Sequence, residues 1–120
     1  MKTVYKVFCV EDNKLKNLFK GLPQEESKRN TRTIQPDVWL QAEKKWSVDG
    51  SGQEEYLTGI HCLLKREDAE NYLDNFRTDR NRVIVECKAR GLRTKPTNDK
   101  VRLADELLVP KENLEKVLTK

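Results

Sequence analysis

The sequence predicts an α+β domain, with a mainly antiparallel sheet of about four to five strands and two to three short helices. Three observations lead to this class. Residues 82–89 alternate apolar and polar side chains, as a strand does when one face lies in the core. Residues 56–64 form an apolar strand that runs almost directly into an amphipathic helix at 66–76. The chain has 120 residues, which suits a single domain over residues 1–120 with a modest core.

The first residues predict a β-hairpin followed by a loop. β-branched and aromatic side chains are dense from residue 3 to residue 10, which favours a strand. Residues 11–14 carry a turn signal, and residues 15–19 can return as a second strand. Residues 24–36 are almost without apolar side chains, and we expect a long polar loop there.

Residues 37–46 are compatible with two structures. We favour a short helix, because residues 41–45 are good helix formers and Asp37 can cap it after a proline. The alternative is a strand that places Leu40 and Trp39 on opposite faces. The apolar side chains that would form the helical stripe are Val38, Trp39, Ala42 and Trp46.

The two tryptophans of this segment are seven residues apart and would share a helical face. Such a pair is most often part of the core, and we favour that interpretation for Trp39 and Trp46. An exposed tryptophan beside the polar loop would instead be a good anchor for a partner. Residues 47–55 are rich in glycine and serine and predict a second polar loop.

The helix at 66–76 is the clearest in the chain. Acidic residues crowd its first turn, where the helix dipole favours negative charge. Its apolar side chains recur at helical spacing on one face: Ala69, Tyr72, Leu73 and Phe76.

Strands and a basic loop are expected in the last third of the chain. Residues 82–89 form one strand, residues 91–100 a basic loop, and residues 101–109 a last strand. Asp105 falls on the apolar face of that last strand, so it is either buried and paired with a cation or marks a bulge. Pro110 suits the start of a closing helix with an apolar face of Leu114, Val117 and Leu118.

The composition predicts a soluble, cytoplasmic protein. Hydrophobic residues make up 36% and charged residues 37%, and no run approaches the roughly 18 apolar residues of a membrane span. The three cysteines, Cys9, Cys62 and Cys87, all fall in predicted strands and contain no C-x-x-C pair, which favours buried thiols in a reducing compartment. A metal site is not favoured because His61 and Cys62, as strand neighbours, point to opposite faces. We expect no cofactor.

Positive charge is concentrated in one part of the chain. Residues 77–100 hold eight basic and three acidic residues, whereas the whole chain has a net charge of only +4. This segment could keep the domain soluble, grip a nucleic-acid backbone, or dock an acidic protein surface. It has no interleaved aromatic side chains for base stacking. The candidate binding residues are Arg77, Arg80, Arg82, Lys88, Arg90, Arg93 and Lys95.

His61 is the only histidine and the only candidate for chemistry near neutral pH. The interpretation we favour is a half-buried strand histidine that bonds a backbone carbonyl. A buried carboxylate nearby, such as Asp105, would make it a candidate functional site. No nucleophile elbow and no phosphate-binding glycine motif accompany it.

Gly59-Ile60-His61, followed by Glu67-Asp68-Ala69 and Tyr72, loosely resembles a pattern in small bacterial and phage proteins. These proteins open with a strand like residues 4–7 and end with one like residues 101–106. The resemblance implies an α+β module and no particular activity. A weaker likeness is to ADP-ribosyltransferases, in which a strand histidine and a helix tyrosine hold a nicotinamide cofactor. It implies a transferase-type enzyme centred on His61, with Tyr72 and Glu106 as helpers, although the chain has no clear Ser-Thr-Ser block.

The sequence thus favours a small non-enzymatic binding or accessory protein, of phage or bacterial type, that uses its basic segment. Its expected partner is an acidic protein or a nucleic-acid backbone, and no membrane. The half-polar strand at 82–90 could also add a strand from a second copy, so we expect a monomer or a weak homodimer. The alternative is the transferase-type enzyme.

Overall fold

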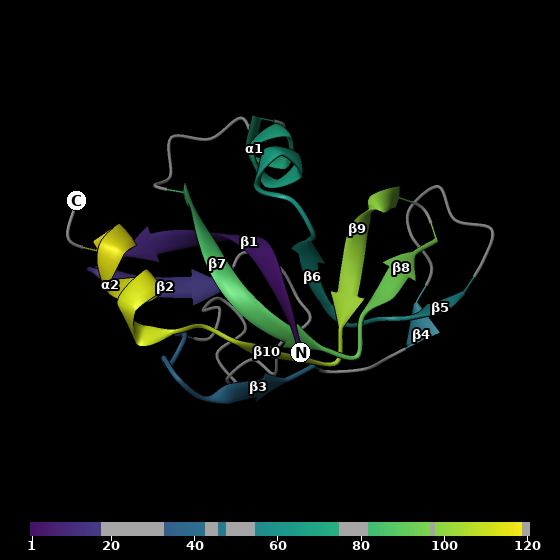
Figure 1. The fold of residues 1–120 in the computed structure, drawn as a ribbon, viewed down its shortest axis with the longest axis horizontal. Coiled ribbons are helices and arrows are strands. Elements are labelled where there is room, and N and C mark those ends of the chain that lie inside the picture. The colour runs from purple at the N-terminus through teal and green to yellow at the C-terminus, as the bar shows by residue number, and fades with distance from the viewer. Residues whose placement is uncertain (18–32, 43–45, 48–54, 75–81, 97, 119–120) are drawn as a thin grey trace.

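The computed structural model describes residues 1–17, 33–42, 46–47, 55–74, 82–96 and 98–118. Antiparallel sheet dominates these residues, with ten strands and two helices (Figure 1). Eight of the strands belong to one sheet. The predicted class of an α+β domain with four to five strands is therefore wrong, because the fold is dominated by its sheet.

The large sheet has the order β3-β10-β7-β1-β6-β9-β8, with β2 paired to β1, and β4 and β5 form a separate pair. Every pairing is antiparallel. The elements are β1 (Lys2–Glu11), β2 (Lys14–Asn17), β3 (Trp39–Gln41), β4 (Trp46–Ser47), β5 (Tyr56–Leu57), β6 (Ile60–Leu63), α1 (Arg66–Asp74), β7 (Arg82–Arg90), β8 (Arg93–Lys95), β9 (Asn98–Ala104), β10 (Glu106–Leu108) and α2 (Lys111–Leu118).

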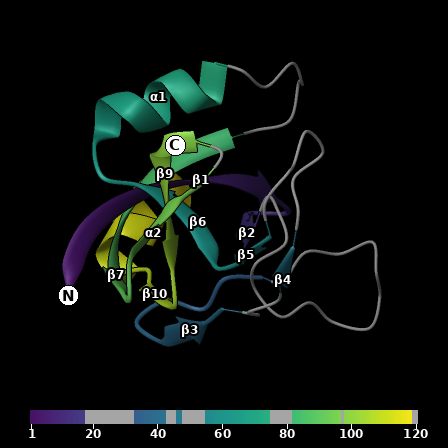
Figure 2. The same ribbon diagram turned by 90° about the vertical axis from the view of Figure 1, so that its right-hand side faces the viewer.

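The strands curve around the core (Figure 2). β1 pairs with β7 on one side and with β6 on the other. β10 pairs with β7, β9 pairs with β6, and only Asp105 separates β9 from β10. Hydrogen-bonded pairs therefore connect β10, β7, β1, β6 and β9 in that order, and the chain itself joins β9 to β10 at Asp105. The buried side chains of the core cluster are Val4, Phe8, Leu15, Ile34, Leu40, Ile60, Cys62, Val85, Cys87, Ala89, Ala104, Leu107 and Val109.

The predicted N-terminal hairpin is confirmed. β1 and β2 pair with Glu11 opposite Lys14, which leaves a two-residue turn. Both turn residues, Asp12 and Asn13, have positive φ, at 52° and 58°. This is the backbone of the tight hairpin turn for which aspartate and asparagine are well suited.

The predicted helix at 37–46 is wrong, because Trp39–Gln41 form β3 and Trp46–Ser47 form β4. β3 pairs with β10, so its hydrogen bonds and buried Leu40 outweigh the modest helix propensity of the neighbouring residues. Asp37 is a capping residue, but for another helix. Its Oδ1 accepts a hydrogen bond of 3.0 Å from the backbone N–H of Lys111, at the start of α2.

The expected loops are only partly within the described residues. Residues 24–32 and 48–54 of the two polar loops lie outside the described residues. Near the end of the first loop, Ile34 is buried, and its N–H donates a hydrogen bond to the carbonyl oxygen of Leu15. The expected basic loop at 91–100 is largely a hairpin of β8 and β9. The expected strand at 101–109 is divided at Asp105 into the end of β9 and all of β10.

Both remaining helices are confirmed within the described residues, while Phe76, expected in the apolar stripe of the first, lies outside them. α1 buries Ala69 and contacts β1, β6 and β7, so it covers one side of the sheet, while β3 lies on the opposite side of the molecule (Figures 1 and 2). α2 packs Leu114 and Val117 against the core cluster. No helix in the described part of the chain is both long and apolar enough to span a bilayer.

Candidate functional site

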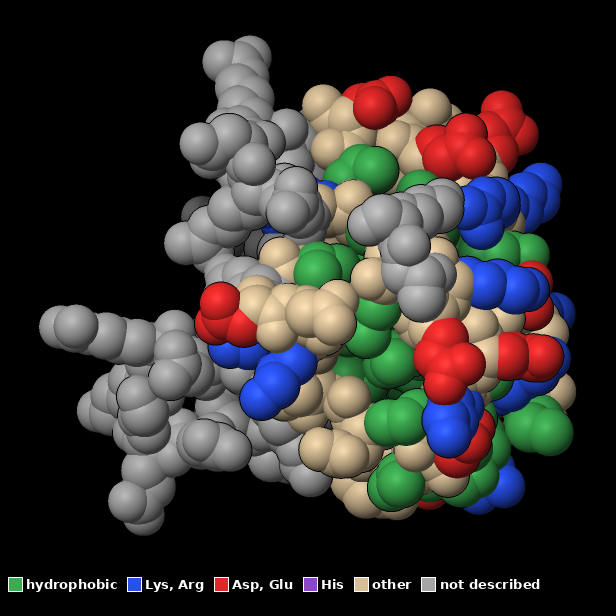
Figure 3. Space-filling model, turned by 90° about the vertical axis from the view of Figure 1, so that its left-hand side faces the viewer, with side chains coloured by type: hydrophobic (Ala, Val, Ile, Leu, Met, Phe, Trp, Pro, Cys, Tyr) green, Lys and Arg blue, Asp and Glu red, His purple; other side chains and the backbone are tan. Residues whose placement is uncertain are grey.

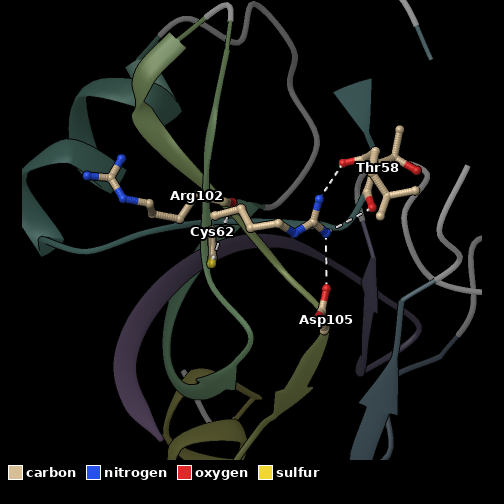
Figure 4. Close-up of polar contacts among 6 residues, drawn as sticks. Thr58, Cys62, Arg102 and Asp105 are labelled. Carbon is tan, nitrogen blue, oxygen red and sulfur yellow. Dashed lines mark hydrogen bonds and ion pairs between the residues drawn. The ribbon is translucent and has the colours of Figure 1, made fainter. Parts of the chain in front are cut away.

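Arg93, a candidate binding residue, is bonded within the protein. Its guanidinium donates to the carbonyl oxygens of Leu57 at 2.7 Å and Thr58 at 3.2 Å. It also forms a 3.0 Å ion pair with Asp105. Figure 4 shows this guanidinium between the Asp105 carboxylate and the chain at Thr58, while the side chain of Arg102 runs the opposite way. Arg93 thus ties β8 to the end of β5 and to the β9–β10 junction.

This arrangement, which we call the Arg93 clamp (Arg93, Asp105, Leu57 and Thr58), needs a glycine beside it. A Cβ on Gly59 would lie 2.9 Å from the carbonyl oxygen of Ala104 and 3.0 Å from a guanidinium nitrogen of Arg93. The first distance is too short for a Cβ against fixed backbone, and the second would push the guanidinium away. The absence of a Cβ at Gly59 therefore lets the arginine and β9 approach the backbone closely.

Asp105 combines both roles that the sequence left open. It pairs with a cation, and it marks the irregularity between β9 and β10. Its N–H is shared between the carbonyl oxygens of Arg90 and Gly91, at 3.0 and 3.2 Å. Gly91 has a φ of +66°, and a Cβ there would lie 2.4 Å from the Asp105 carboxylate. The turn after β7 is therefore built around this carboxylate.

A second group of side chains lies on the outward face of four neighbouring strands. The strand registers align them in two rows. The first row crosses β1, β7, β10 and β3, and the second crosses β7, β10 and β3. All seven residues are exposed or half-exposed, whereas the side chains between them point into the core. We call this surface the Arg90 face: Thr3, Lys88, Leu108 and Trp39 in the first row, and Arg90, Glu106 and Gln41 in the second.

Arg90 stacks on an aromatic ring at the centre of this face. Its guanidinium carbon lies 3.7 Å from the centroid of the Trp39 ring, a close cation–π contact. Its ion pair with Glu106 is long, at 3.9 Å, and 49% of the Arg90 side chain remains exposed. Glu106 also accepts a 2.6 Å hydrogen bond from Gln41. The Trp39 ring and Glu106 therefore hold Arg90 while about half of its side chain faces solvent.

The other basic candidates differ in their surroundings. Lys88 donates to the hydroxyl of Thr3 at 2.8 Å and belongs to the Arg90 face. Arg82 shares a side of β7 with Lys88 and Arg90 but lies at the far end of the strand, opposite Cys9, and Lys95 is on β8, opposite Asn98, so neither belongs to the Arg90 face. Arg77 and Arg80 lie outside the described residues.

Charges of both signs lie close together on the surface. Glu86 and Glu106 are on the same side of the sheet as Lys88 and Arg90, by their strand registers. On the side of the molecule that carries α2, acidic and basic side chains also lie next to one another along one edge (Figure 3). The described basic residues therefore do not form one continuous field of positive charge.

Lys6 is a charged group that the sequence analysis passed over. It lies on the core face of β1, with 3% of its surface exposed, and its Nζ donates to the carbonyl oxygen of His61 at 2.7 Å. Burial lowers the pKa of Lys6 to about 8, although the thiols of Cys62 and Cys87 oppose this shift. The alternation of β1 did place Lys6 among inward-facing positions, so its burial could have been found.

All three cysteines lie in strands and are buried, as predicted. Burial raises the pKa of the Cys62 thiol to about 11, and it also raises the pKa of Cys87. Because the thiolate is the reactive form, these two thiols are poor nucleophiles at neutral pH. Among the described residues, no group of three or more His, Cys, Asp or Glu side chains is placed to hold a metal ion.

The residues of the transferase alternative lie on three different elements. His61 is half-buried in β6, opposite Leu103, and Tyr72 is half-buried on α1, where burial raises its pKa. Glu106 is on β10, and its carboxylate is bonded to Gln41 and Arg90. The structure therefore ties the proposed catalytic glutamate to the Arg90 face and not to His61.

Trp39 is the residue of this region that sequence reasoning misplaced. We favoured a core tryptophan on a helix, whereas it is a half-exposed strand residue beneath Arg90. The weighed alternative, a strand with Leu40 and Trp39 on opposite faces, is the one that the structure adopts. The core prediction is wrong for Trp46 as well, because this side chain is 68% exposed.

Fold and site together define a small antiparallel sheet module with an ordered arginine–tryptophan pair on an open sheet face. No protein family model matches the chain, and neither a curated protein nor a solved structure shows significant similarity to it. The function must therefore be argued from the surface itself.

Proposed function

We propose that this chain is a non-enzymatic protein-binding module, and that the Arg90 face is its docking surface. Its partner is a protein that presents carboxylates to Lys88 and Arg90. We also propose that the protein acts in the cytoplasm, where buried thiols such as those of Cys62 and Cys87 stay reduced.

The stack of Arg90 on Trp39 is the observation that carries this proposal. Tryptophan and arginine are the residues most enriched among the hot spots of protein interfaces. A long flexible arginine normally loses side-chain entropy on binding, but here the ring already holds it in place. Leu108 and Thr3 lie in the same row as Trp39 and give the face a partly apolar surface.

The mixture of charges favours a protein over a nucleic acid. A nucleic-acid backbone is uniformly negative, and it binds surfaces where cations are not interleaved with carboxylates. The Arg90 face includes Glu106, which would repel phosphates while it fits a complementary protein surface. Arg93, part of the basic segment on which nucleic-acid binding would depend, is already bonded in the clamp.

The proposal is tested by affinity capture with a matched control. The protein is immobilised and exposed to a lysate of the organism that encodes it, and retained proteins are identified by mass spectrometry. We expect a specific acidic protein to be retained by the wild type and lost with the double variant Trp39→Ala/Arg90→Glu. The control Lys65→Glu reverses an exposed charge at the start of α1 and should retain it.

Nucleic-acid binding is measured in parallel by fluorescence anisotropy of labelled single- and double-stranded DNA and RNA. We expect no binding at physiological salt. Binding that weakens steeply with salt and is lost with Arg90→Glu would replace the proposal with a backbone-binding function. Capture that is identical for wild type and double variant would also contradict it.

A further inference from the structure

The strand β3 ends the large sheet, and no described strand pairs with its outer edge. It lies at the lower margin of the molecule in both ribbon views (Figures 1 and 2). The N–H of Ala42 donates to the carbonyl oxygen of Asp105 at 2.9 Å, so Leu40, two residues earlier, also directs its backbone groups toward β10. Because this direction alternates along a strand, the N–H and C=O groups of Trp39 and Gln41 point to the outer edge.

The other margins of the large sheet are protected against pairing. β2 has two lysines, and β8 has Arg93 and Lys95 together with an irregular register. The part of β7 beyond β10 is covered by α2, where the side-chain amide of Asn113 donates to the carbonyl oxygen of Glu86 at 3.0 Å. Charges, irregularities and covering helices are the usual means of keeping a strand edge from adding another strand. β3 has no charged residue and none of these devices along its outer edge.

We propose that a second copy of this chain pairs with the outer edge of β3, so that the two chains form a two-fold symmetric dimer. The two β3 strands run antiparallel, with Leu40 of each copy opposite Leu40 of the other. Trp39 of each copy is then opposite Gln41 of the other, and each such pair exchanges both of its backbone hydrogen bonds. The same register brings Val38, which is 51% exposed, alongside Ala42 of the second copy and covers apolar surface beyond the strand ends.

The side chains of β3 suit this symmetric pairing. Trp39 and Gln41, which face each other across the axis, are both uncharged. The corresponding pairing of two β8 strands would place Arg93 opposite Lys95, and like charges in that position are destabilising. The two Trp39 rings become diagonal neighbours on the outward face, about 7–8 Å apart and within reach of each other. Each ring, already stacked against Arg90 of its own copy, thus gains a second aromatic neighbour.

This inference does not depend on the proposed function, because the Arg90 faces of both copies stay on the outward side of the joined sheet. It adds a partner, a second copy, and the strand through which that partner binds. A short strand buries little surface, so we expect a weak, concentration-dependent dimer.

Sedimentation equilibrium of the full-length protein from about 10 µM to about 1 mM tests the dimer. The average mass should rise from 14.1 kDa toward twice that value. Gln41→Pro removes an N–H of the outer edge, where proline is tolerated, and should weaken the dimer about tenfold or more. The matched control Gln41→Thr loses the same side-chain bond to Glu106 but keeps the N–H, and should change the affinity less than about threefold. Circular dichroism checks that both variants fold.

Hydrogen exchange of the wild type, followed by NMR, locates the interface without any variant. The amides of Trp39 and Gln41 should exchange more slowly as the protein concentration rises, whereas those of β8 should not change. A monomer at every concentration would overturn the inference. So would slowed exchange at β8 in place of β3, or a folded Gln41→Pro variant that dimerises as strongly as the wild type.

Discussion

Arg90 and Arg93 are three residues apart on consecutive strands, and the structure places them in opposite roles. Arg93 is surrounded by two carbonyl oxygens and a carboxylate, and it connects three segments of the chain. Arg90 rests on the Trp39 ring with a single long ion pair and half of its surface exposed. One arginine holds the fold together, and the other is oriented toward solvent.

The difference shows why a concentration of basic residues does not by itself define a binding surface. A guanidinium has five donors, and the surroundings decide whether they are used inside the protein. Arg93 uses its donors on the backbone carbonyls of Leu57 and Thr58 and on the Asp105 carboxylate. Arg90 meets a ring, which orients it without using its hydrogen bonds. The predictions below separate these roles, from the largest expected effect to the smallest.

The largest effect is expected from Arg93→Met. The substitution keeps the length of the apolar stem but removes the hydrogen bonds from Arg93 to two carbonyl oxygens and its ion pair with Asp105. We expect the free energy of unfolding to fall by about 2–4 kcal/mol. Urea denaturation followed by circular dichroism measures this change.

Arg90→Met is the matched control for that experiment, because the same substitution removes only an exposed ion pair and a ring contact. It should lower the free energy of unfolding by no more than about 1 kcal/mol. Equal losses for the two variants would show that Arg93 does not have the structural role inferred here.

Gly91→Ala comes next, because this residue lies between the two arginines. Its φ of +66° is unfavourable for alanine, and the new Cβ would lie 2.4 Å from the carboxylate that pairs with Arg93. We expect a loss of about 2 kcal/mol in the free energy of unfolding. In an Asp105→Ala background, only the cost of placing alanine at a positive φ should remain, and the loss in the free energy of unfolding should drop to about 1 kcal/mol. A loss that is unchanged in that background would argue against a clash with Asp105.

Several elements could be predicted from the sequence because their signals are local. The β1–β2 turn, α1 and β7 have the turn residues, the helical stripe and the alternation that specify them. The predicted fold class was wrong because short strands have little sequence pattern of their own. β3, β8 and β10 have three residues each, and pairing with distant strands stabilises them, which no window of sequence reveals.

The candidate site was predictable only as a set of residue types. The sequence located the basic segment and flagged Asp105 as irregular. It could not tell that Arg93 would meet Leu57 and Thr58, which lie some 35 residues earlier. It also could not place Trp39 under Arg90, since this contact depends on β3 and β7 both lying beside β10.

Lys6 provides a third case, a cation inside the core. Its pKa is about 8 in the folded protein and about 10.5 when exposed, so between these values the unfolded chain binds more protons. The contribution of Lys6 to the free energy of unfolding should therefore increase by about 1 kcal/mol between pH 7.5 and 9, measured as the difference between the wild type and Lys6→Met. Urea denaturation at several pH values measures both proteins.

The buried thiols limit the range of that experiment. Burial raises the pKa of Cys62 to about 11 and also raises the pKa of Cys87, so from about pH 8 upward the folded protein retains protons that the unfolded chain loses. The thiols therefore lower the free energy of unfolding over part of the range in which Lys6 raises it, and only the comparison with Lys6→Met isolates the lysine. The same pH dependence for the wild type and Lys6→Met between pH 7.5 and 9 would contradict the assignment of Lys6 as a buried cation.

The smallest effect concerns the contact between Arg90 and Trp39. We expect a double-mutant cycle of Arg90→Met and Trp39→Leu to give a coupling free energy of about 0.5–1 kcal/mol for folding. The ring lies beneath the guanidinium, so the attraction should persist when salt screens the ion pair with Glu106. A coupling that vanishes in high salt would mean that Glu106, and not the ring, holds Arg90 in place. Since the docking proposal depends on an arginine that is already ordered, the same result would remove its main support while leaving the Arg93 clamp unaffected.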